Sequence, residues 1–349
     1  MSEHSNIQWT DSTWNPIVGC TIVSPGCTNC YAMKWAHSGM KAIKHYDGTT
    51  KVVNGHAIWT GLVRQAPEHI LMAPLKWKKP RRIFVNSMSD LFHEDVPDEW
   101  IDRVFAVMAL CPQHVFQVLT KRSKRMMAYC LRPKINEIVW DKADEFACDL
   151  RLPENHPSCD YLLGGKAGAA WPLPNVWLGV SCEDQTRADE RIPDLLATPA
   201  AVRFVSAEPL LGPIDFSRHI EIRMPSLYSP VEVNLDWIIV GGESGPGSRP
   251  FDLAWGRSII GQCQAAGVPV FMKQLGAQPL ETMGSTMRHD DPNDIELMME
   301  KAMTSPPPKG WTRIHDGRKT SLYRYHRLKN KKGGDPLEWP EDLRVRQMP

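Results

Sequence analysis

Short apolar runs alternate with longer amphipathic segments from about residue 80 onward. The runs are apolar on both faces, which is typical of parallel strands that are covered on each side. They are Ile83–Ser87, Val115–Thr120, Val176–Ser181, Val202–Ser206, Trp237–Gly241 and Val268–Met272. With a further strand near Thr13–Gly19, the pattern predicts about seven strands.

Three amphipathic segments between these runs have helical spacing. They are Asp98–Cys111, Asp184–Ala197 and Phe251–Ala266, and the last of them stops at Gly267, which is a common helix end. Repeated strand–helix units imply a parallel α/β domain. We therefore expect a complete or partial (β/α) barrel, with a doubly wound open sheet as the alternative.

Two regions break this alternation. Residues 131–175 are predicted to form a loop-rich insertion, and residues 275–310 are rich in Met, Asp and Pro. The expected domains are thus a barrel over residues 1–275, with the insertion, and a loop-rich basic extension over residues 276–349. Cys130, Cys148 and Cys159 are spaced too widely to indicate a site. Buried or incidental thiols are the favoured interpretation, and an auxiliary cluster is the other.

The overall charge indicates no class of partner, whereas the hydropathy pattern suggests a cellular compartment. The chain has 349 residues and a formal net charge of +1, so its total charge names no partner. We see neither a basic start followed by an apolar run nor an apolar stretch long enough to span a membrane. A cytoplasmic location is expected, and in that reducing compartment clustered cysteines indicate metal ligands rather than disulfides.

Cys20, Cys27 and Cys30 lie in one short glycine-bearing loop with the spacing C-x6-C-x2-C. Closed structural metal sites normally use four protein ligands, so three thiolates leave one coordination position open. This pattern favours a [4Fe–4S] cluster whose free iron binds S-adenosylmethionine, hereafter SAM. A zinc site completed by His37 and a set of unconnected thiols both remain alternatives.

Polar residues follow nearly every predicted strand. In barrels the carboxyl ends of the strands build the active site, so these residues are predicted to converge on one pocket. The alternative is that any strand turns polar where it leaves the core. The segments are Ser87–Asp90, Thr120–Lys121, Ser181–Glu183, Ser206–Glu208, Gly242–Ser244 and Lys273–Gln274.

Individual residues in these segments have their own alternatives. Glu243 lies in a glycine-rich turn that offers backbone N–H groups and one carboxylate for an amine, a ribose or a carboxylate, or it is an exposed residue of a tight turn. Lys121 is either an anion ligand or a solvated lysine. Asp90 has acidic and histidine neighbours, but their spacing matches no defined metal site.

Two basic runs carry aromatic residues nearby. They cover residues 76–82 and 309–332. Basic side chains bind phosphates and aromatic rings stack on bases, so contact with nucleic acid is one interpretation. A solvated surface is the other.

Seven motifs together resemble the phage Gp37/Gp68 family, also called DUF5131, over most of the chain. They are Gln8–Pro16, the cysteine motif, Phe84–Phe92, Val118–Lys121, Gly179–Ser181, Ser206–Leu210 and Val240–Gly245. That family is similar in turn to radical SAM enzymes, especially to the spore photoproduct lyase group of DNA repair enzymes. This second likeness rests on the order in which the cysteine motif and the polar strand ends follow one another along the chain.

The resemblance implies a radical SAM enzyme that cleaves SAM reductively and abstracts hydrogen from a substrate, with nucleic acid as a candidate substrate. The three cysteines of the motif would ligate the cluster. Ser89, Lys121 and Ser181 would hold SAM, with Lys121 on its carboxylate. Asp90, Glu208 and Glu243 complete the candidate cofactor-binding residues. The expected partners are an electron donor such as flavodoxin or ferredoxin and an operon-encoded partner protein. We expect no contact with a membrane.

Three departures from the radical SAM pattern are visible. Six residues separate the first two cysteines where three are usual, and Asn29 stands where an aromatic residue is common. Glu243 comes too late in the chain to match the early Gly-Gly-Glu motif. Two other classes of function remain open: a zinc-stabilised nucleic-acid-binding module without catalysis, and a sugar- or nucleotide-processing barrel enzyme with inert thiols.

Overall fold

The computed structural model describes residues 4–40, 42–151, 170–220, 234–282, 310, 312–315 and 320–349. The chain divides into two compact units. Unit 1 comprises Met1–Cys182, Arg187–Ser206 and Ser229–Asp236, and unit 2 comprises Glu183–Thr186, Ala207–Tyr228 and Trp237–Pro349. The two units are described in turn below.

Seven strands form one sheet in the order β1-β6-β7-β8-β9-β10-β12, so the predicted number is confirmed. The fold is α/β with a partial (β/α) barrel of parallel strands. The strands are β1 Ser12–Trp14, β6 Arg82–Val85, β7 Val115–Thr120, β8 Val176–Ser181, β9 Val202–Ala207, β10 Trp237–Gly241 and β12 Val270–Gln274. Continuous apolar runs predicted these strands well because both of their faces are covered.

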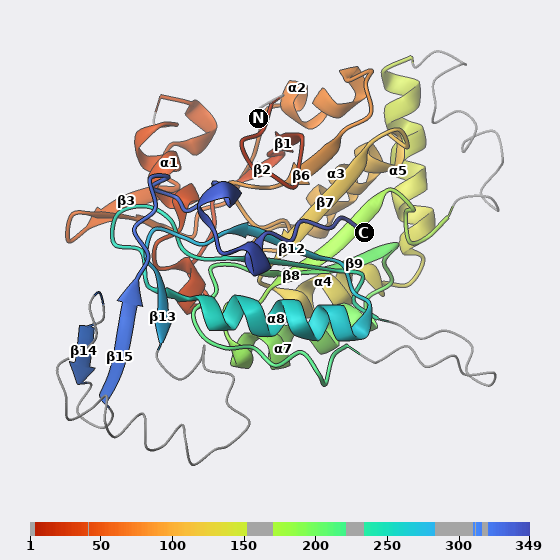
Figure 1. Ribbon diagram of the computed structural model, residues 1–349. Coiled ribbons are helices and arrows are strands. Elements are labelled where there is room, and N and C mark those ends of the chain that lie inside the picture. Colours follow the sequence, from red (N-terminus) through yellow and green to blue (C-terminus); the bar gives the residue numbers. More distant parts are fainter. Residues whose placement is uncertain are drawn as a thin grey trace, which may run out of the picture. The chain divides into compact units, whose positions relative to one another are not determined.

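Unit 1 carries most of the helices that cover the sheet. In α3, the apolar stripe that predicted a helix is buried at Ile101, Val104, Phe105 and Met108, and α3 packs beside α5 (Figure 1). Acidic residues in the first turn of α3 stabilise the helix, because its amino end carries a partial positive charge. The α-helices of this part are α1 Tyr31–Ser38, α2 Glu68–Leu71, α3 Asp98–Ala109, α4 Ser123–Cys130, α5 Ile135–Asp149 and α7 Gln185–Ala197.

Shorter elements complete unit 1, and two of them, β3 and β4, pack against α1. β2 pairs with β5, and β3 pairs with β4 as a hairpin. These strands are β2 Ile17–Val18, β3 Thr50–Val53, β4 His56–Trp59 and β5 Arg64–Gln65. Three 3-10 helices are η1 Pro25–Cys27, η2 Lys44–Tyr46 and η3 Ala73–Lys76.

One face of the unit 1 sheet is filled by aromatic rings. The ring of Trp9 lies 4.9 Å from that of Phe84 and 6.4 Å from that of Phe204, measured between centroids. Gln117, which is opposite Phe84 in the β6–β7 register, donates its side-chain N–H to the Trp9 carbonyl at 3.3 Å. The amino-terminal segment thus packs against this face and contributes to the core.

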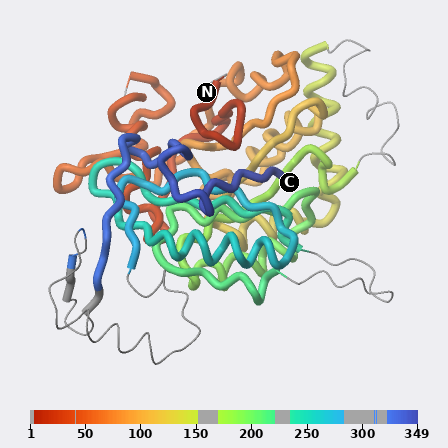
Figure 2. Tube along the Cα trace, in the orientation of Figure 1, coloured from red at the N-terminus to blue at the C-terminus, as the bar shows by residue number. Residues whose placement is uncertain are grey.

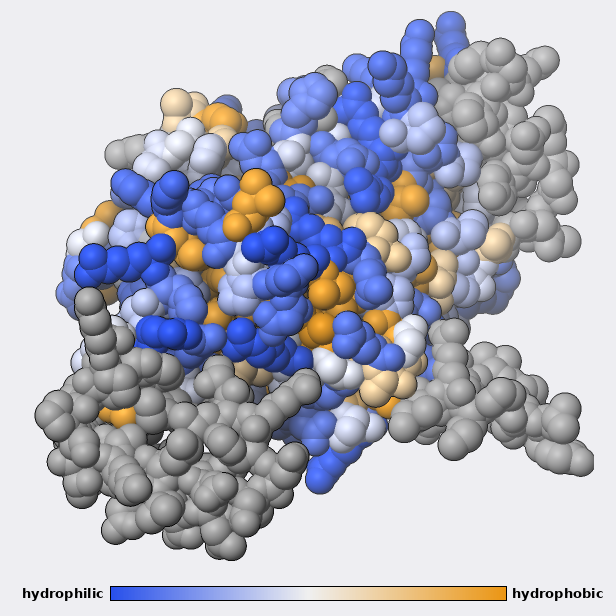
Figure 3. Space-filling view, viewed as in Figure 1, coloured by the Kyte–Doolittle hydropathy of each residue, from blue (hydrophilic) through white to orange (hydrophobic). Residues whose placement is uncertain are grey.

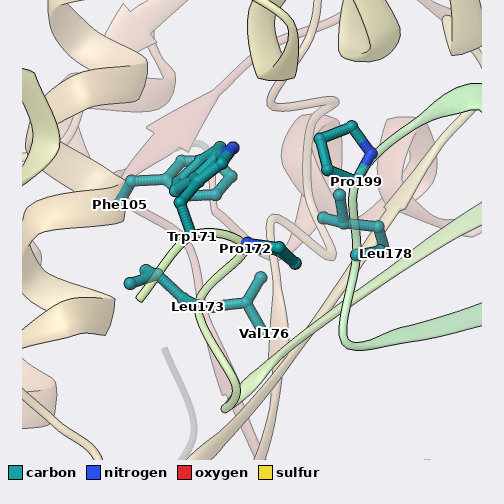
Figure 4. Close-up of a pocket in the computed structure, with 8 residues that line it drawn as sticks. Phe105, Trp171, Pro172, Leu173, Val176, Leu178 and Pro199 are labelled. Atoms are coloured by element: carbon teal, nitrogen blue, oxygen red, sulfur yellow. The ribbon is translucent and has the colours of Figure 1, made fainter. Parts of the chain in front are cut away.

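The other face of the sheet packs against helices. Figure 4 shows a small apolar pocket there, in which Phe105 of α3 and Trp171 lie near Leu178 of β8. Its lining is hydrocarbon and aromatic, which is the composition of a packing defect in a core rather than of a polar site.

The region predicted as a loop-rich insertion begins with a helix. α5 occupies fifteen residues of it, and Val139, Trp140 and Phe146 are buried, so the expectation of a loop was wrong for this part. Cys130 is buried, as expected, whereas Cys148 is exposed on α5. Cys159 lies outside the described residues.

Unit 2 contains β10 and β12 with α8, Leu253–Ala266, packed on them (Figure 1). Asp252 caps the amino end of α8 by accepting the Ala254 N–H at 3.0 Å. As predicted, the helix ends at Gly267, whose φ of +68° suits glycine. A second sheet has the order β11-β13-β15-β14, formed by β11 Phe251–Asp252, β13 Pro279–Thr282, β15 Thr320–Tyr325 and β14 Thr312–His315.

The C-terminal extension is therefore more structured than the expected loops. Besides β13–β15 it holds the 3-10 helices η5 Pro336–Glu338 and η6 Glu341–Leu343. The final segment runs along the edge of β12, where Met272 donates its N–H to the Val345 carbonyl and Gln347 donates to Val270 (Figure 2). Residues 283–309, 311 and 316–319 of the extension lie outside the described residues.

The described helices include none that is long and apolar enough to cross a membrane. On the face drawn in Figure 3, hydrophobic side chains occur as small groups separated by hydrophilic ones. Scattered groups of this kind are normal for a protein surface in water.

Candidate cysteine-loop site

The segment from residue 19 to residue 30, here called the cysteine loop, connects β2 to α1. Gly19 has a φ of +90°, and a Cβ atom there would lie 2.0 Å from the Leu62 carbonyl oxygen, so the loop entry requires glycine. The η1 turn holds Cys27, and Cys30 is the residue that precedes α1. A close backbone approach followed by a tight turn therefore gathers the three cysteines within one short segment.

The three thiols of the loop are free and half-buried. Burial raises the pKa of Cys20 to about 12, and the positive charge of Arg122 opposes that rise. Burial also raises the pKa of Cys30, against the effect of backbone N–H groups of α1. Each of these two thiols is influenced electrostatically by Cys27, so the three sulfurs lie within electrostatic reach of one another.

Arg122, just beyond the end of β7, is the buried cation of the site. Its Nη1 lies 3.6 Å from the Cys20 sulfur and 3.0 Å from Asp90 Oδ2. Its Nε donates to Glu94 at 2.9 Å and its Nη2 to the Thr21 hydroxyl at 2.6 Å. The side chain is only 4% exposed, which makes its charge effective at the sulfur. One guanidinium thus joins the cysteine loop to the ends of two strands.

Asp90 anchors this arrangement with both carboxylate oxygens. Oδ1 accepts the Thr120 hydroxyl at 2.6 Å and the Phe92 N–H at 3.0 Å. Oδ2 accepts the Lys121 N–H at 2.9 Å in addition to Arg122. The residue expected to bind a cofactor is therefore engaged by the chain itself and acts on the site by positioning its neighbours.

His93 ties the next turn to the cysteine loop. The Asp95 N–H donates to His93 Nδ1 at 3.1 Å, and His93 Nε2 lies 3.0 Å from the Thr21 hydroxyl oxygen. Burial lowers the pKa of His93. A neutral ring that accepts at Nδ1 and donates from Nε2 satisfies both contacts.

Two of the three residues predicted to hold SAM approach the cysteine loop. Ser89 donates its hydroxyl to the Ile17 carbonyl at 2.7 Å, and its backbone bridges to Gly19. The charge of Lys121 lowers the pKa of Cys30, so that ammonium lies within electrostatic reach of the loop. Ser181 is 3% exposed at the end of β8, where its carbonyl accepts a hydrogen bond from Arg191 at 2.7 Å.

His37, the alternative zinc ligand, lies in the last turn of α1 with its Nδ1 3.5 Å from the Thr50 hydroxyl. Across the described residues, no three or more His, Cys, Asp or Glu side chains are grouped so that they could hold a metal ion. Ligands of a single zinc ion share one centre, whereas a four-iron cluster carries its thiolates on different irons. Thiolates are the ligands that iron–sulfur clusters use, and the structure brings three free thiols into one loop with the Arg122 N–H near one sulfur.

In unit 2, Glu208 lies against the end of β10. Its Oε1 is 3.0 Å from the Lys273 ammonium. A Cβ at Gly241 would come within 2.4 Å of the same oxygen, so the glycine makes room for the carboxylate. Glu208 is thus a paired carboxylate within its own unit.

Glu243, also in unit 2, is buried rather than exposed. It is 6% exposed and accepts three hydrogen bonds from Arg249: from the backbone N–H at 2.8 Å, from Nε at 3.0 Å and from Nη2 at 2.6 Å. This pairing closes the glycine-rich turn. The interpretation of Glu243 as an exposed turn residue was therefore wrong.

Sequence reasoning missed Arg122, although it noted the charged run that contains it. A cation that comes directly after a polar strand end could have been singled out with Lys121. Its four partners could not, because they come from segments that meet only in the folded chain.

The fold and the site define an α/β protein with a partial parallel barrel and a three-cysteine loop. The chain belongs to DUF5131, a protein family of unknown function, whose sequence model matches residues 4–338. No curated protein and no solved structure matches it.

Proposed function

We propose that this protein is a radical SAM enzyme in which Cys20, Cys27 and Cys30 hold a [4Fe–4S] cluster. The observation that carries the proposal is the contact between the buried Arg122 guanidinium and the Cys20 sulfur, within a loop of three free thiols. A cluster of this kind supplies the electron that cleaves SAM into methionine and a radical able to take hydrogen from a substrate.

The residues around the loop have distinct roles in this proposal. Arg122 donates an N–H to one ligating sulfur, and hydrogen bonds of this kind tune a cluster's reduction potential. Lys121 offers a point charge for the carboxylate of SAM. Ser89, beyond the end of β6, and Ser181, at the end of β8, would add hydroxyl groups. Asp90 holds the backbone N–H of Lys121 and the guanidinium of Arg122 in place.

That Glu208 and Glu243 bind a cofactor stays a prediction. Each carboxylate already has a cationic partner, Lys273 or Arg249. To bind an amine or a ribose, either carboxylate would have to share or exchange that partner.

Nucleic acid is the proposed substrate class. Support comes from the exposed cations Arg327, Lys329, Lys331 and Lys332 and from Tyr325, which is 45% exposed. Such cations bind phosphates and such a ring stacks on a base. The reaction also needs a one-electron donor, for which flavodoxin or ferredoxin is the proposed partner, and an operon-encoded protein is a further proposed partner.

Metal analysis of protein purified without oxygen tests the cluster. About four irons and four sulfides per chain, with a brown absorption that dithionite bleaches, are expected. Dithionite and SAM should then yield 5′-deoxyadenosine and methionine. Cys27→Ala should lose the iron, whereas Cys148→Ala, at an exposed thiol on α5, should retain it. One zinc per chain and no colour would overturn the proposal.

A further inference from the structure

Asn86 is the residue directly after β6, and it carries a buried amide that no described residue satisfies. It is 3% exposed, and its φ of +58° is in the left-handed region. Neither its Oδ1 nor its Nδ2 has a hydrogen-bond partner among the described residues. Within the same residues it is the one side chain with two such atoms. A buried polar group without a partner is costly and requires a specific explanation.

The turn that follows Asn86 is held without this amide. The Asn86 N–H donates to the Trp14 carbonyl at 2.7 Å. Asn15 Oδ1 accepts the Ser87 hydroxyl at 3.1 Å and the Met88 N–H at 3.0 Å. Glycine would adopt the same backbone conformation more easily and would bury no amide. The Asn86 side chain therefore has no visible structural task in the described part of the chain.

The same turn is fastened to the cysteine loop at two points. Tyr31, which follows the last cysteine, donates its hydroxyl to the Ser87 carbonyl at 2.8 Å. Gly19, which precedes the first cysteine, bridges to Ser89. Asn86 directly follows Val85, the last residue of β6, so its amide lies at the carboxyl end of that strand. The unsatisfied amide thus belongs to the turn that supports the candidate cluster site.

We propose that Asn86 binds the edge of an adenine base through paired hydrogen bonds. An asparagine amide presents one acceptor beside one donor, which matches the amino group of adenine and its ring nitrogen N7. Oδ1 accepts from the amino group and Nδ2 donates to the ring nitrogen. The inference rests on the proposed function, which supplies adenine from SAM; a nucleic-acid substrate supplies the same edge.

Calorimetric titration with S-adenosylhomocysteine, which is not cleaved, tests the inference on cluster-loaded protein. Asn86→Gly should bind it about tenfold more weakly or worse, since the paired contact is lost. Asn86→Asp keeps the shape and one acceptor but loses the donor, and it should also bind weakly. Both variants should retain the iron content of the wild type. The matched control is Asn54→Gly, at an exposed left-handed asparagine in the β3–β4 hairpin, and its affinity should not change.

The base itself provides a second measurement. S-inosylhomocysteine carries an oxygen in place of the adenine amino group, so its edge beside ring nitrogen N7 holds two acceptors and cannot donate to Oδ1. The wild type should prefer the adenine compound, and Asn86→Gly should lose that preference. The same two bases are compared in single-stranded oligonucleotides. If only the oligonucleotides show a preference for adenine over hypoxanthine that depends on Asn86, the adenine comes from the substrate.

Three results would count against the inference, and they are distinguishable. Equal affinity and equal base preference in folded Asn86→Gly and Asn86→Asp would overturn it and assign the amide to a buried water. A wild type that holds iron but binds neither adenine probe would overturn the inference while leaving the cluster. A wild type without iron would overturn the proposed function, and the inference with it.

Discussion

The guanidinium of Arg122 lies 3.6 Å from the Cys20 sulfur and 3.0 Å from the Asp90 carboxylate. The Arg122 and Asp90 side chains are 4% and 7% exposed, so they form a buried ion pair. Removing one partner of such a pair leaves an uncompensated charge in a medium that solvates it poorly. Both the stability of the fold and the chemistry of the cysteine loop therefore depend on this pair.

Arg122→Gln should lower the free energy of unfolding by about 3–5 kcal/mol, because Asp90 would remain buried without its cation. Urea unfolding followed by circular dichroism measures the change. The double variant with Asp90→Asn should lose less than the sum of the two single losses, since it leaves no unpaired charge. Additive losses would show that the two side chains do not act as a pair.

Arg122→Gln should also slow the alkylation of Cys20 in protein free of metal. Burial raises the pKa of Cys20 to about 12 even though the positive charge of Arg122 acts to lower it. Without that charge the thiolate fraction falls, and with it the rate of reaction with iodoacetamide. Mass spectrometry of the Cys20 peptide gives the rate, with the exposed Cys148 as internal reference. An unchanged Cys20 rate in a folded variant would contradict this electrostatic role.

Gly179 of β8 is predicted to tolerate no side chain. A Cβ there would lie 2.6 Å from the ring of Phe204 on the adjacent strand. Gly179→Ala should therefore destabilise unit 1 by about 1–3 kcal/mol through overpacking. Thermal unfolding measures the effect, and adding Phe204→Leu should restore part of it. The control is Gly261→Ala in α8, where a Cβ meets nothing within 4 Å and helix propensity favours alanine. Equal stability of Gly179→Ala and the wild type would refute the close contact.

Acid should weaken the contribution of Asp98 to stability. Burial raises the pKa of this carboxyl. Hydrogen bonds from Arg125 and Arg132 lower it by more, so the net pKa lies below the ordinary 3.8. The unfolded chain then binds the proton more readily, and the contribution is present above about pH 4 and is lost as pH falls through the folded pKa. Unfolding free energies of the wild type and Asp98→Asn should differ at neutral pH and converge in acid. A difference that grows in acid would have the wrong sign.

The exposed cations near the C-terminus should carry the salt dependence of nucleic-acid binding. Replacing Lys329, Lys331 and Lys332 by Gln should reduce the slope of log affinity against log salt by about 0.7 per lost contact with a single strand. Fluorescence anisotropy at several salt concentrations measures the slope. Replacing Lys34, Lys51 and Lys142 by Gln changes the charge equally and provides the control. If both triple variants changed the slope equally, the C-terminal run would not be a specific contact.

The main elements of the barrel could be predicted from the sequence. β7, β8 and β10 match the expected runs residue for residue, since strands covered on both faces are continuously apolar. α5 was missed because its apolar positions lie in a stretch whose following segment is rich in Pro and Gly. The polar residues that follow the strands were visible in the sequence, and their convergence on one pocket stays a prediction.

The sequence by itself determined the parallel strands, the helices between them and the grouping of three cysteines in one loop, since all of these follow from local periodicity and spacing. Only the tertiary structure decided that Arg122 meets Cys20, that Arg249 pairs with Glu243 and that the Asn86 amide has no partner among the described residues. Hydrogen-bond partners and burial depend on which distant segments meet, and no local pattern encodes that.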